Sequence, residues 1–164
     1  APSAHNRQPW RFAVLDSAEA RLKLTEAMGQ DFRRDLEADG LPPQEVELRV
    51  ARARQRVLDA PAAIVVCCDE TTLDQYPDEK RQAAERIMAE QSVAMAGQNL
   101  LLAASFEGLG AVWMCAPLFA QQTVQHVLDL PPGWKPQGLA LVGYPAEQPR
   151  QKELRPQSET TIFR

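Results

Sequence analysis

The sequence predicts an α+β fold in a single domain spanning residues 1–164. The chain has about the length of one domain, and 45% of its residues are hydrophobic, with charges of both signs spread among them; this composition is typical of a globular protein. Short β-prone runs are separated by helical segments, and the chain contains no internal repeat. The longest helical segment is predicted over residues 78–106.

The first strand is predicted at Trp10–Leu15, where large apolar residues alternate. An Asp-Ser pair then offers caps for a helix over residues 18–36. A Gly-Leu-Pro-Pro stretch breaks this helix, and a second one is predicted over residues 43–59. The valines of the second helix follow the three-to-four-residue spacing of one buried stripe.

The next strand is predicted at residues 61–68, a continuous apolar run that suits the middle of a sheet. Cys67 and Cys68 should point to opposite faces of this strand, so they are not expected to form a disulfide. Together with Cys115 they are interpreted as reduced, intracellular thiols in buried strands. A metal clamp is disfavoured because the usual ligand spacing and a nearby histidine are absent.

The helix predicted over residues 78–106 becomes almost entirely Ala, Met and Leu from Ser92 onward. A helix that is apolar all round is expected to be buried on every side. Gly97 would allow a close approach. We therefore expect a central helix between the sheet and a second subunit or a cofactor.

The last third of the chain predicts two further strands, over residues 108–115 and 138–144, with a short amphipathic helix over 119–128 between them. Residues 131–134 are expected to form a loop. Residues 160–163 are β-prone but have no hairpin partner in the sequence, so they are a candidate for pairing with a sheet in another chain.

Charge and hydropathy exclude several classes of partner. The net charge of −4 comes from 22 acidic and 18 basic residues without a basic stripe, so no nucleic acid is expected. No apolar run is long enough to cross a membrane, and a soluble, cytoplasmic protein is expected. The chain begins with Ala in a loop-like segment, and we expect that an N-terminal part of the domain is missing.

Motifs for phosphate cradling, zinc proteolysis and serine hydrolysis are absent from the sequence. Only His5 and His126 could carry protons near neutral pH. His126 lies within the short amphipathic helix, where a packing or surface role is expected. His5 is better placed and is a hypothetical proton donor.

Polar groups are concentrated in the segment from Ser3 to Gln8, which Pro9 and Trp10 anchor at the start of a strand. Asn and Gln amides can pair with the donors and acceptors of a pyrimidine-like ring, so this loop suits a flat heteroaromatic ligand. The alternative is a loop that satisfies only its own backbone.

Five motifs occur in an order that resembles the FMN-dependent nitroreductase superfamily. They are Pro2-Ser3-x-x-Asn6-x-Gln8-Pro9-Trp10, Leu100-Leu-Leu-Ala-Ala, Gly108-Leu-Gly-Ala-Val-Trp113, Asp129-Leu-Pro131 and Gly143-Tyr-Pro145. Residues 34–42, 76–78, 118–119 and 128–131 are similar to the C-terminal domain of the bifunctional ligase/reductase of coenzyme F420, a deazaflavin hydride carrier. The resemblance implies a three-layer α/β/α fold with a mostly antiparallel sheet and a long central helix.

The resemblance also implies site residues. Ser3, Asn6 and Gln8 would face FMN from the first loop, and Cys115 would line it after a strand. Lys152 matches a basic residue that binds the flavin phosphate, with Arg155 as a second candidate. Asp35 matches a position that contacts the deazaflavin, and no metal is implied.

The resemblance further implies a homodimer with FMN shared between subunits. The family's Arg-x-Ser-x-Arg phosphate segment has no counterpart here, for which truncation is the simpler account. The function implied is an FMN-dependent reductase of a dehydro-F420 precursor or of nitro and quinone compounds. The alternative is a non-catalytic flavin- or deazaflavin-binding module that assists a glutamyl ligase.

Overall fold

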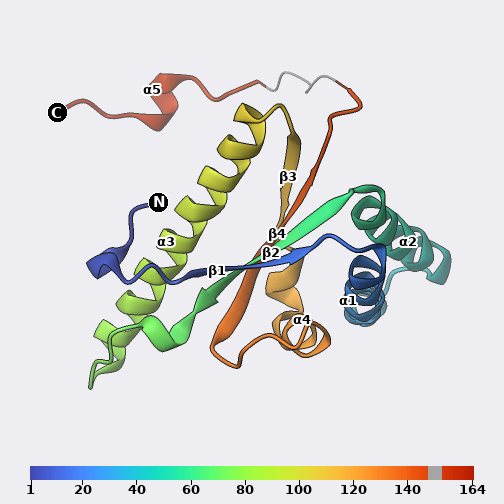
Figure 1. Cartoon of the computed structure of the whole chain (residues 1–164), viewed down its shortest axis with the longest axis horizontal. Coiled ribbons are helices and arrows are strands. Elements are labelled where there is room, and N and C mark those ends of the chain that lie inside the picture. Colours follow the sequence, from blue (N-terminus) through green and yellow to red (C-terminus); the bar gives the residue numbers. More distant parts are fainter. Residues whose placement is uncertain (148–152) are drawn as a thin grey trace.

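A four-stranded sheet forms the middle of the protein in a computed structural model that describes residues 1–147 and 153–164 (Figure 1). The strands are β1 (Trp10–Leu15), β2 (Ala62–Asp69), β3 (Gly110–Met114) and β4 (Trp134–Gly143). Their spatial order is β1-β2-β4-β3, and all three pairings are antiparallel. The predictions of a central second strand and an antiparallel sheet are confirmed.

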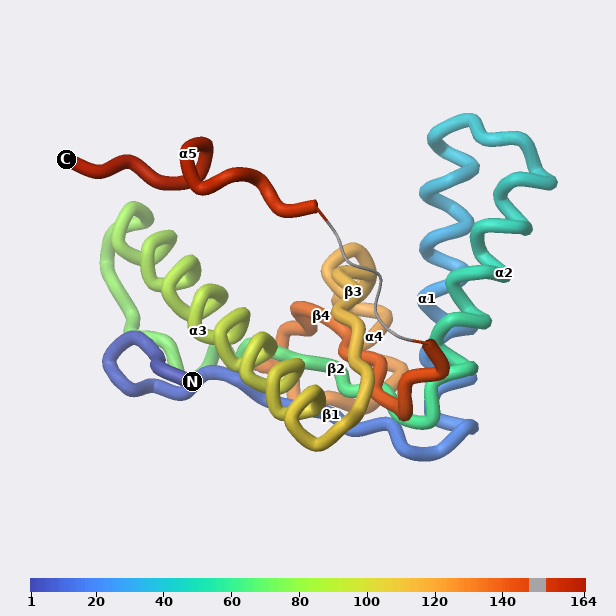
Figure 2. The backbone as a smooth tube through the Cα atoms, turned by 90° about the horizontal axis from the view of Figure 1, so that it is seen from above, coloured from blue at the N-terminus to red at the C-terminus, as the bar shows by residue number. Residues whose placement is uncertain are grey.

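Helices cover both faces of the sheet, which gives the expected three layers (Figure 2). The helices are α1 (Ala18–Ala38), α2 (Pro43–Asp59), α3 (Glu79–Phe106), α4 (Gln121–Val127) and α5 (Gln157–Thr160), with 3-10 turns η1 (Ala4–Asn6), η2 (Glu70–Thr72) and η3 (Ala116–Phe119). No helix in the described ranges is both long enough and apolar enough to cross a lipid bilayer.

Two hydrophobic cores lie on opposite faces of the sheet. The larger one joins α1 and α4 to β2 and β4, and it includes Leu24, Cys67 and Leu139. The smaller one joins α3 to β2 and includes Cys68 and Val93. Adjacent side chains of a strand point to opposite faces, so the expected separation of the two neighbouring cysteines is confirmed, and both are free thiols.

The helix boundaries follow local capping chemistry. The Ser17 side chain accepts a hydrogen bond from Ala20 N at 3.1 Å, and Asp78 accepts one from Arg81 N at 2.9 Å, so each begins a helix as an N-cap. Gly40, with φ of 77°, separates α1 from α2, and Pro43 is the first residue of α2. These two helices pack as a hairpin that extends from one end of the sheet (Figure 2).

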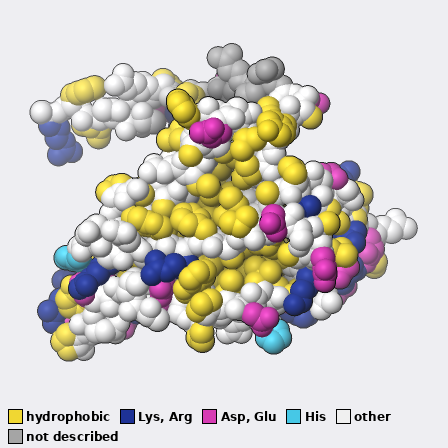
Figure 3. All heavy atoms as spheres, viewed as in Figure 1, with side chains coloured by type: hydrophobic (Ala, Val, Ile, Leu, Met, Phe, Trp, Pro, Cys, Tyr) yellow, Lys and Arg dark blue, Asp and Glu magenta, His cyan; other side chains and the backbone are white. Residues whose placement is uncertain are grey.

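Helix α3 was expected to lie between the sheet and a second subunit or a cofactor, and the contact with the sheet is present. Ala89, Val93 and Ala96 are buried, whereas Ile87 and Leu102 are 54% and 58% exposed. Within one chain the sheet covers one side of this apolar helix, and the opposite side is open. Figure 3 shows hydrophobic side chains gathered across the middle of the molecular face on which β1 and α3 lie.

Two predictions about the last third of the chain are wrong in detail, and a third, pairing of residues 160–163 with another chain, stays a prediction. Strand β4 begins at Trp134 rather than at Gly138, because β2 continues past a bulge at Val66/Cys67 and pairs with residues 134–136. The helix predicted over 119–128 is the 3-10 turn η3 followed by α4. The β-prone run at 160–163 is not a strand in the single chain, since α5 ends at Thr160 and no regular element follows.

Candidate functional site

The polar loop before β1 has a left-handed backbone at three residues that are not glycine. His5, Asn6 and Gln8 have φ of 49°, 53° and 49°. This region is sparsely populated by residues with a side chain and is tolerated best by Asn and Asp. Hydrogen bonds hold the shape: Gln8 N donates to Ser3 Oγ at 3.0 Å, and Gln8 Nε2 donates to Asn6 Oδ1 at 3.1 Å.

The same hydrogen bonds leave part of the loop free for a ligand. Ser3 Oγ serves as an acceptor, so its own proton remains available. In the described part of the chain, no bond uses Asn6 Nδ2 or Gln8 Oε1. The loop therefore satisfies its own backbone in part, as the alternative interpretation held, and still presents a donor and an acceptor at exposed positions.

An ion pair clamps the loop to the sheet. Arg11 Nη2 lies 2.9 Å from Asp69 Oδ2, and Arg11 Nη1 donates to the carbonyls of Gln8 and Trp10 at 2.9 and 2.8 Å. Asp69 N also donates to Pro9 O at 2.7 Å. The largely buried Asp69 carboxylate thus fixes the Arg11 guanidinium, which in turn holds the last residues of the loop. No local sequence pattern indicates this pair, because Arg11 and Asp69 come together only when β1 and β2 align.

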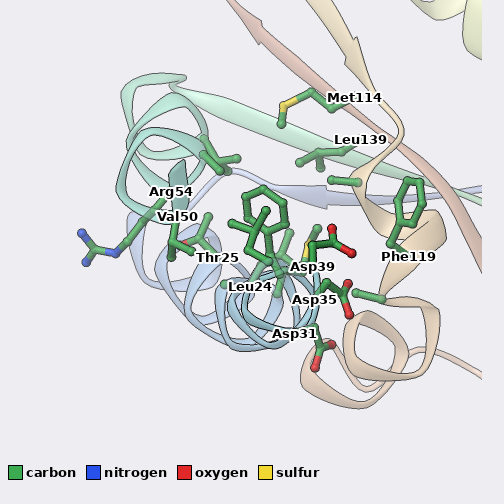
Figure 4. Close-up of a pocket in the computed structure, with 18 residues that line it drawn as sticks. Leu24, Thr25, Asp31, Asp35, Asp39, Val50, Arg54, Met114, Phe119 and Leu139 are labelled. Carbon is green, nitrogen blue, oxygen red and sulfur yellow. The ribbon is translucent and has the colours of Figure 1, made fainter. Parts of the chain in front are cut away.

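A cavity of about 440 Å³ lies between α1, α2 and the η3 turn (Figure 4). Its floor is apolar and includes Leu24, Val50 and Leu139. Phe119 faces it from η3 in Figure 4, and the Arg54 guanidinium points away from it. A concave apolar site of this size suits a small aromatic ligand.

Three aspartates lie along one rim of this cavity. Asp31, Asp35 and Asp39 are spaced one turn apart on α1, and their carboxylates gather on one side in Figure 4. Asp31 is paired with Arg34. The other two are exposed, so the rim can accept hydrogen bonds from a ligand whose flat body lies on the apolar floor.

The predicted site residues fall into two groups within one chain. Ser3, Asn6 and Gln8 lie together in the loop beside α3. Asp35 and the Cys115 segment meet at the cavity, since Met114 and Ala116 both line it. Figures 1 and 2 both place η1 and η3 well apart on the molecule.

Cys115 and Arg155 are both exposed, and one further candidate is not among the described residues. Cys115 is exposed at the end of β3, so the prediction of three buried cysteines is wrong for this residue, which caps η3 instead of continuing the strand. Arg155 is exposed in the C-terminal tail. Lys152 lies outside the described residues.

The two histidines occupy different surroundings. His126 is exposed on α4, as expected. The His5 imidazole is within 4.8 Å of carboxylate oxygens of Asp74 and Glu85. These two acidic partners could not be predicted, because they follow His5 by about 70 and 80 positions and no local spacing relates them.

The cavity lining was also missed, although the sequence holds a signal for it. Met28, Phe32 and Asp35 repeat at helical spacing along α1, on the side that meets Phe119. Of these three residues, only Asp35 was expected to contact a ligand. When the apolar side of a helix extends beyond the edge of the sheet that it covers, as it does here, it indicates a cavity or a partner.

Comparisons with known proteins agree with the fold. A family model described as the nitroreductase family matches residues 1–144. The 5,6-dimethylbenzimidazole synthase of Rhodospirillum rubrum is 35% identical over 153 residues, which cover 90% of this chain and 67% of that protein. A protein of Methanothermobacter thermautotrophicus named as an NADH dehydrogenase/NAD(P)H nitroreductase is 31% identical over 155 residues, covering 93% and 64%.

A solved structure is also similar. The nitroreductase-like family protein from Bacillus cereus superposes with a TM-score of 0.73 at 25% identity, over 99% of this chain and 77% of that one. The chain thus spans about two thirds of the length of the two curated relatives and about three quarters of this solved structure.

Proposed function

Because this chain belongs to the nitroreductase family, we propose that it is an FMN-dependent reductase, which passes a hydride to a small molecule through bound flavin. The observation that carries the proposal is the preformed loop from Ser3 to Gln8. Its left-handed backbone, its clamp to Arg11 and its unused amide groups make it a rigid polar wall. Such a wall suits the edge of a flavin ring.

The donor set of the loop fits FMN. The Ser3 hydroxyl and the Asn6 amide can donate, and the Gln8 carbonyl can accept, which matches the mixed edge of the ring. When bound, FMN supplies the hydride chemistry, and the protein supplies position and electrostatics. Donors fixed beside the ring would favour its negatively charged reduced form, because they need no reorganisation when charge develops.

The flavin phosphate requires cations. Arg155 is exposed in the tail and Lys152 follows the resemblance, so we propose these two as phosphate ligands. Exposed charges contribute little to affinity singly. A double Lys152→Ala/Arg155→Ala variant should therefore lose FMN affinity more than either single variant.

We also propose a homodimer that shares its flavin sites. The loop group and the Cys115 group lie apart in one chain, so a second copy is needed to place both beside one flavin. The open side of α3 offers a surface, with Met95, Leu102 and Phe106 exposed at helical spacing. Exposed apolar patches of this kind favour association.

The cavity beside Cys115 would take the substrate. Its apolar floor suits the flat ring of a nitroaromatic, a quinone or a dehydro-F420 precursor, and Asp35 can accept a hydrogen bond from a ring N–H. A substrate that accepts a hydride also gains a proton, and water can supply this proton, so no acidic side chain has to contact the substrate. We therefore assign binding residues and no catalytic acid.

A second candidate comes from the relative with 35% identity, which is named as a 5,6-dimethylbenzimidazole synthase. The chain matches that protein over 90% of its own residues. If this chain has the same activity, mass spectrometry of reaction mixtures will show 5,6-dimethylbenzimidazole. The absence of that product beside measurable quinone or nitro reduction would favour the reductase.

The reductase is tested with purified protein loaded with FMN. Anaerobic addition of NAD(P)H should bleach the flavin, and a quinone or the dehydro-F420 precursor should restore its absorbance. Tight deazaflavin binding without any redox change would instead support the binding module.

Two variants assign the two residue groups in the same assay. Asn6→Ala should weaken FMN binding, whereas Asp35→Asn should raise KM for the substrate and leave FMN affinity unchanged. Equal loss of FMN by both variants would contradict the assignment of separate roles.

A further inference from the structure

A histidine and two acidic residues from three separate segments meet at the outer end of the N-terminal loop. His5 belongs to the loop, Asp74 follows η2, and Glu85 lies in the second turn of α3. Each offers one ligand atom, and these atoms all lie within 4.8 Å of one another. The group is distinct from Ser3, Asn6 and Gln8, which the proposed flavin site uses.

Glu85 is the unusual member of this cluster. The residue is only 2% exposed, and its Oε2 is buried with no hydrogen-bond partner among the described residues. Its Oε1 accepts a single bond from Asp74 N at 3.2 Å. A buried carboxylate oxygen without a donor is costly, so native proteins nearly always provide it with one or with a cation.

We propose that His5, Asp74 and Glu85 bind a divalent transition-metal cation, for which Zn²⁺ is the first probe. One imidazole nitrogen and two carboxylate oxygens form a ligand set that zinc and its neighbours accept at about 2.0–2.2 Å. Because the ligand atoms are up to 4.8 Å apart, the exposed His5 side chain has to move slightly toward the two carboxylates when the cation binds. A dication balances the two carboxylates and gives the orphaned Glu85 oxygen a partner.

The neighbouring charge does not block the site. Arg7 pairs with Asp74 through Oδ1, and the Asp74 carboxylate has a second oxygen for the cation. In a site with three protein ligands, the remaining coordination positions are filled by water.

The cation would tie the loop to the helix beneath it. The described loop is joined directly to α3 by one hydrogen bond, from Ala4 N to Ser92 Oγ at 3.3 Å. Coordination through His5 and Glu85 adds a second and stronger link. The site is therefore structural, and it stands independently of whether the loop binds flavin.

The test is a calorimetric titration of Zn²⁺ into the metal-free full chain without flavin. We expect saturable binding of one Zn²⁺ per chain. His5→Ala and Glu85→Gln should each weaken it at least tenfold, since each removes a ligand. Glu85→Gln keeps a side-chain oxygen that can accept the hydrogen bond from Asp74 N. Circular dichroism should show that this variant is folded.

Two control variants separate ligation from other effects. Arg7→Gln alters the same loop and keeps all three ligands, and His126→Ala removes the other histidine; both should bind Zn²⁺ within about twofold of the unaltered chain. A loss in Arg7→Gln equal to that in His5→Ala would overturn the proposal, because loop shape would then account for binding.

Thermal unfolding gives an independent measurement. Zn²⁺ should raise Tm of the unaltered chain and of His126→Ala, because the cation binds the folded state, and at the same concentration it should raise Tm of His5→Ala clearly less. Absence of binding to the unaltered chain, or an equal rise in Tm for His5→Ala, would contradict the site. Glu85 would then be a buried structural side chain.

Discussion

The indole of Trp113 lies directly against the backbone of Gly97, and a Cβ built on that glycine would be only 2.8 Å from Trp113 Cζ3. The same ring lies against Gly138 on β4, where a Cβ would be 2.0 Å from Cζ2. One aromatic ring therefore sets the distance between α3 and the sheet. The ring fits there because Gly97 on α3 and Gly138 on β4 have no side chains that would occupy its place.

A methyl group at Gly97 is predicted to destabilise the fold. Gly97→Ala should lower the free energy of unfolding by about 1–3 kcal/mol, since Trp113 is held on both sides and cannot yield freely. Gly29→Ala is the matched control in another helix, where the nearest atom lies at an ordinary 3.6 Å. It should be neutral or stabilising by up to about 1 kcal/mol. Urea unfolding of both variants checks this, and equal effects would contradict the close contact.

Arg21 is predicted to stabilise the junction of β1, α1 and β2. Its Nη1 donates to the carbonyls of Leu15, Asp16 and Pro61 at 3.3, 3.0 and 2.7 Å, and the residue is buried. Arg21→Met should cost about 3 kcal/mol because buried carbonyls lose a charged donor. Lys23→Met, an exposed change two positions away, should stay within about 0.5 kcal/mol. A small effect of Arg21→Met in urea unfolding would contradict this role.

The three thiols are predicted to differ in reactivity. Burial, and then the nearby Cys68, raise the pKa of Cys67 to about 12. Burial, followed by Glu70, Glu90 and Asp69 and opposed by Arg11, raises the pKa of Cys68 to about 11. Cys115 is exposed. Thiol titration of the folded chain should therefore detect one reactive cysteine, lost in Cys115→Ser, up to about pH 10.

The same two pKa shifts predict how stability depends on pH. A thiol in the unfolded chain titrates near pH 8.5, well below the folded values, so the folded state retains its protons longer. This contribution is complete below about pH 8.5 and is lost as pH rises toward about 11 to 12. Cys68→Ala should reduce the loss of stability between about pH 8 and pH 10.5. An unchanged pH dependence in that variant would contradict the raised pKa.

Dimer formation through α3 is tested by introducing a charged residue on the open side of this helix. Leu102→Glu puts a carboxylate on the open side of α3, where the side chain is 58% exposed. In the proposed interface this charge would be desolvated, so light scattering should show a monomer that has also lost FMN. Leu48→Glu, at a comparably exposed leucine on α2, is the matched control and should remain a dimer. Dissociation of both variants, or of neither, would contradict the interface.

Strands and helices with a local signal could be predicted from the sequence. The run at Trp10–Leu15 and the helix at Pro43–Asp59 have the predicted bounds, because alternation and a Pro at the first helical turn are local properties. The start of β4 was missed because Pro131-Pro-Gly-Trp134 has the composition of a loop. Residues 134–136 join the sheet only because β2 extends to Asp69, about 65 positions earlier in the chain.

The site could be predicted only in part for the same reason. The loop from Ser3 to Gln8 is contiguous, so its polar groups could be identified together. The Arg11–Asp69 clamp and the meeting of His5 with Glu85 join residues that only the tertiary fold brings near. Helix α3 was expected to lie between the sheet and a second subunit or a cofactor, since periodicity shows that a helix is apolar and does not show which of these covers it.

The most direct test of the proposed function is the absorbance of FMN bound to the purified protein during anaerobic reduction and reoxidation. The flavin should remain with the protein through gel filtration, bleach with NAD(P)H or dithionite, and recover when a quinone or nitroaromatic compound is added. Asn6→Ala should release the flavin. A protein that folds and dimerises but retains no FMN, or whose reduced FMN is not reoxidised by any of these acceptors, would contradict the proposal of an FMN-dependent reductase.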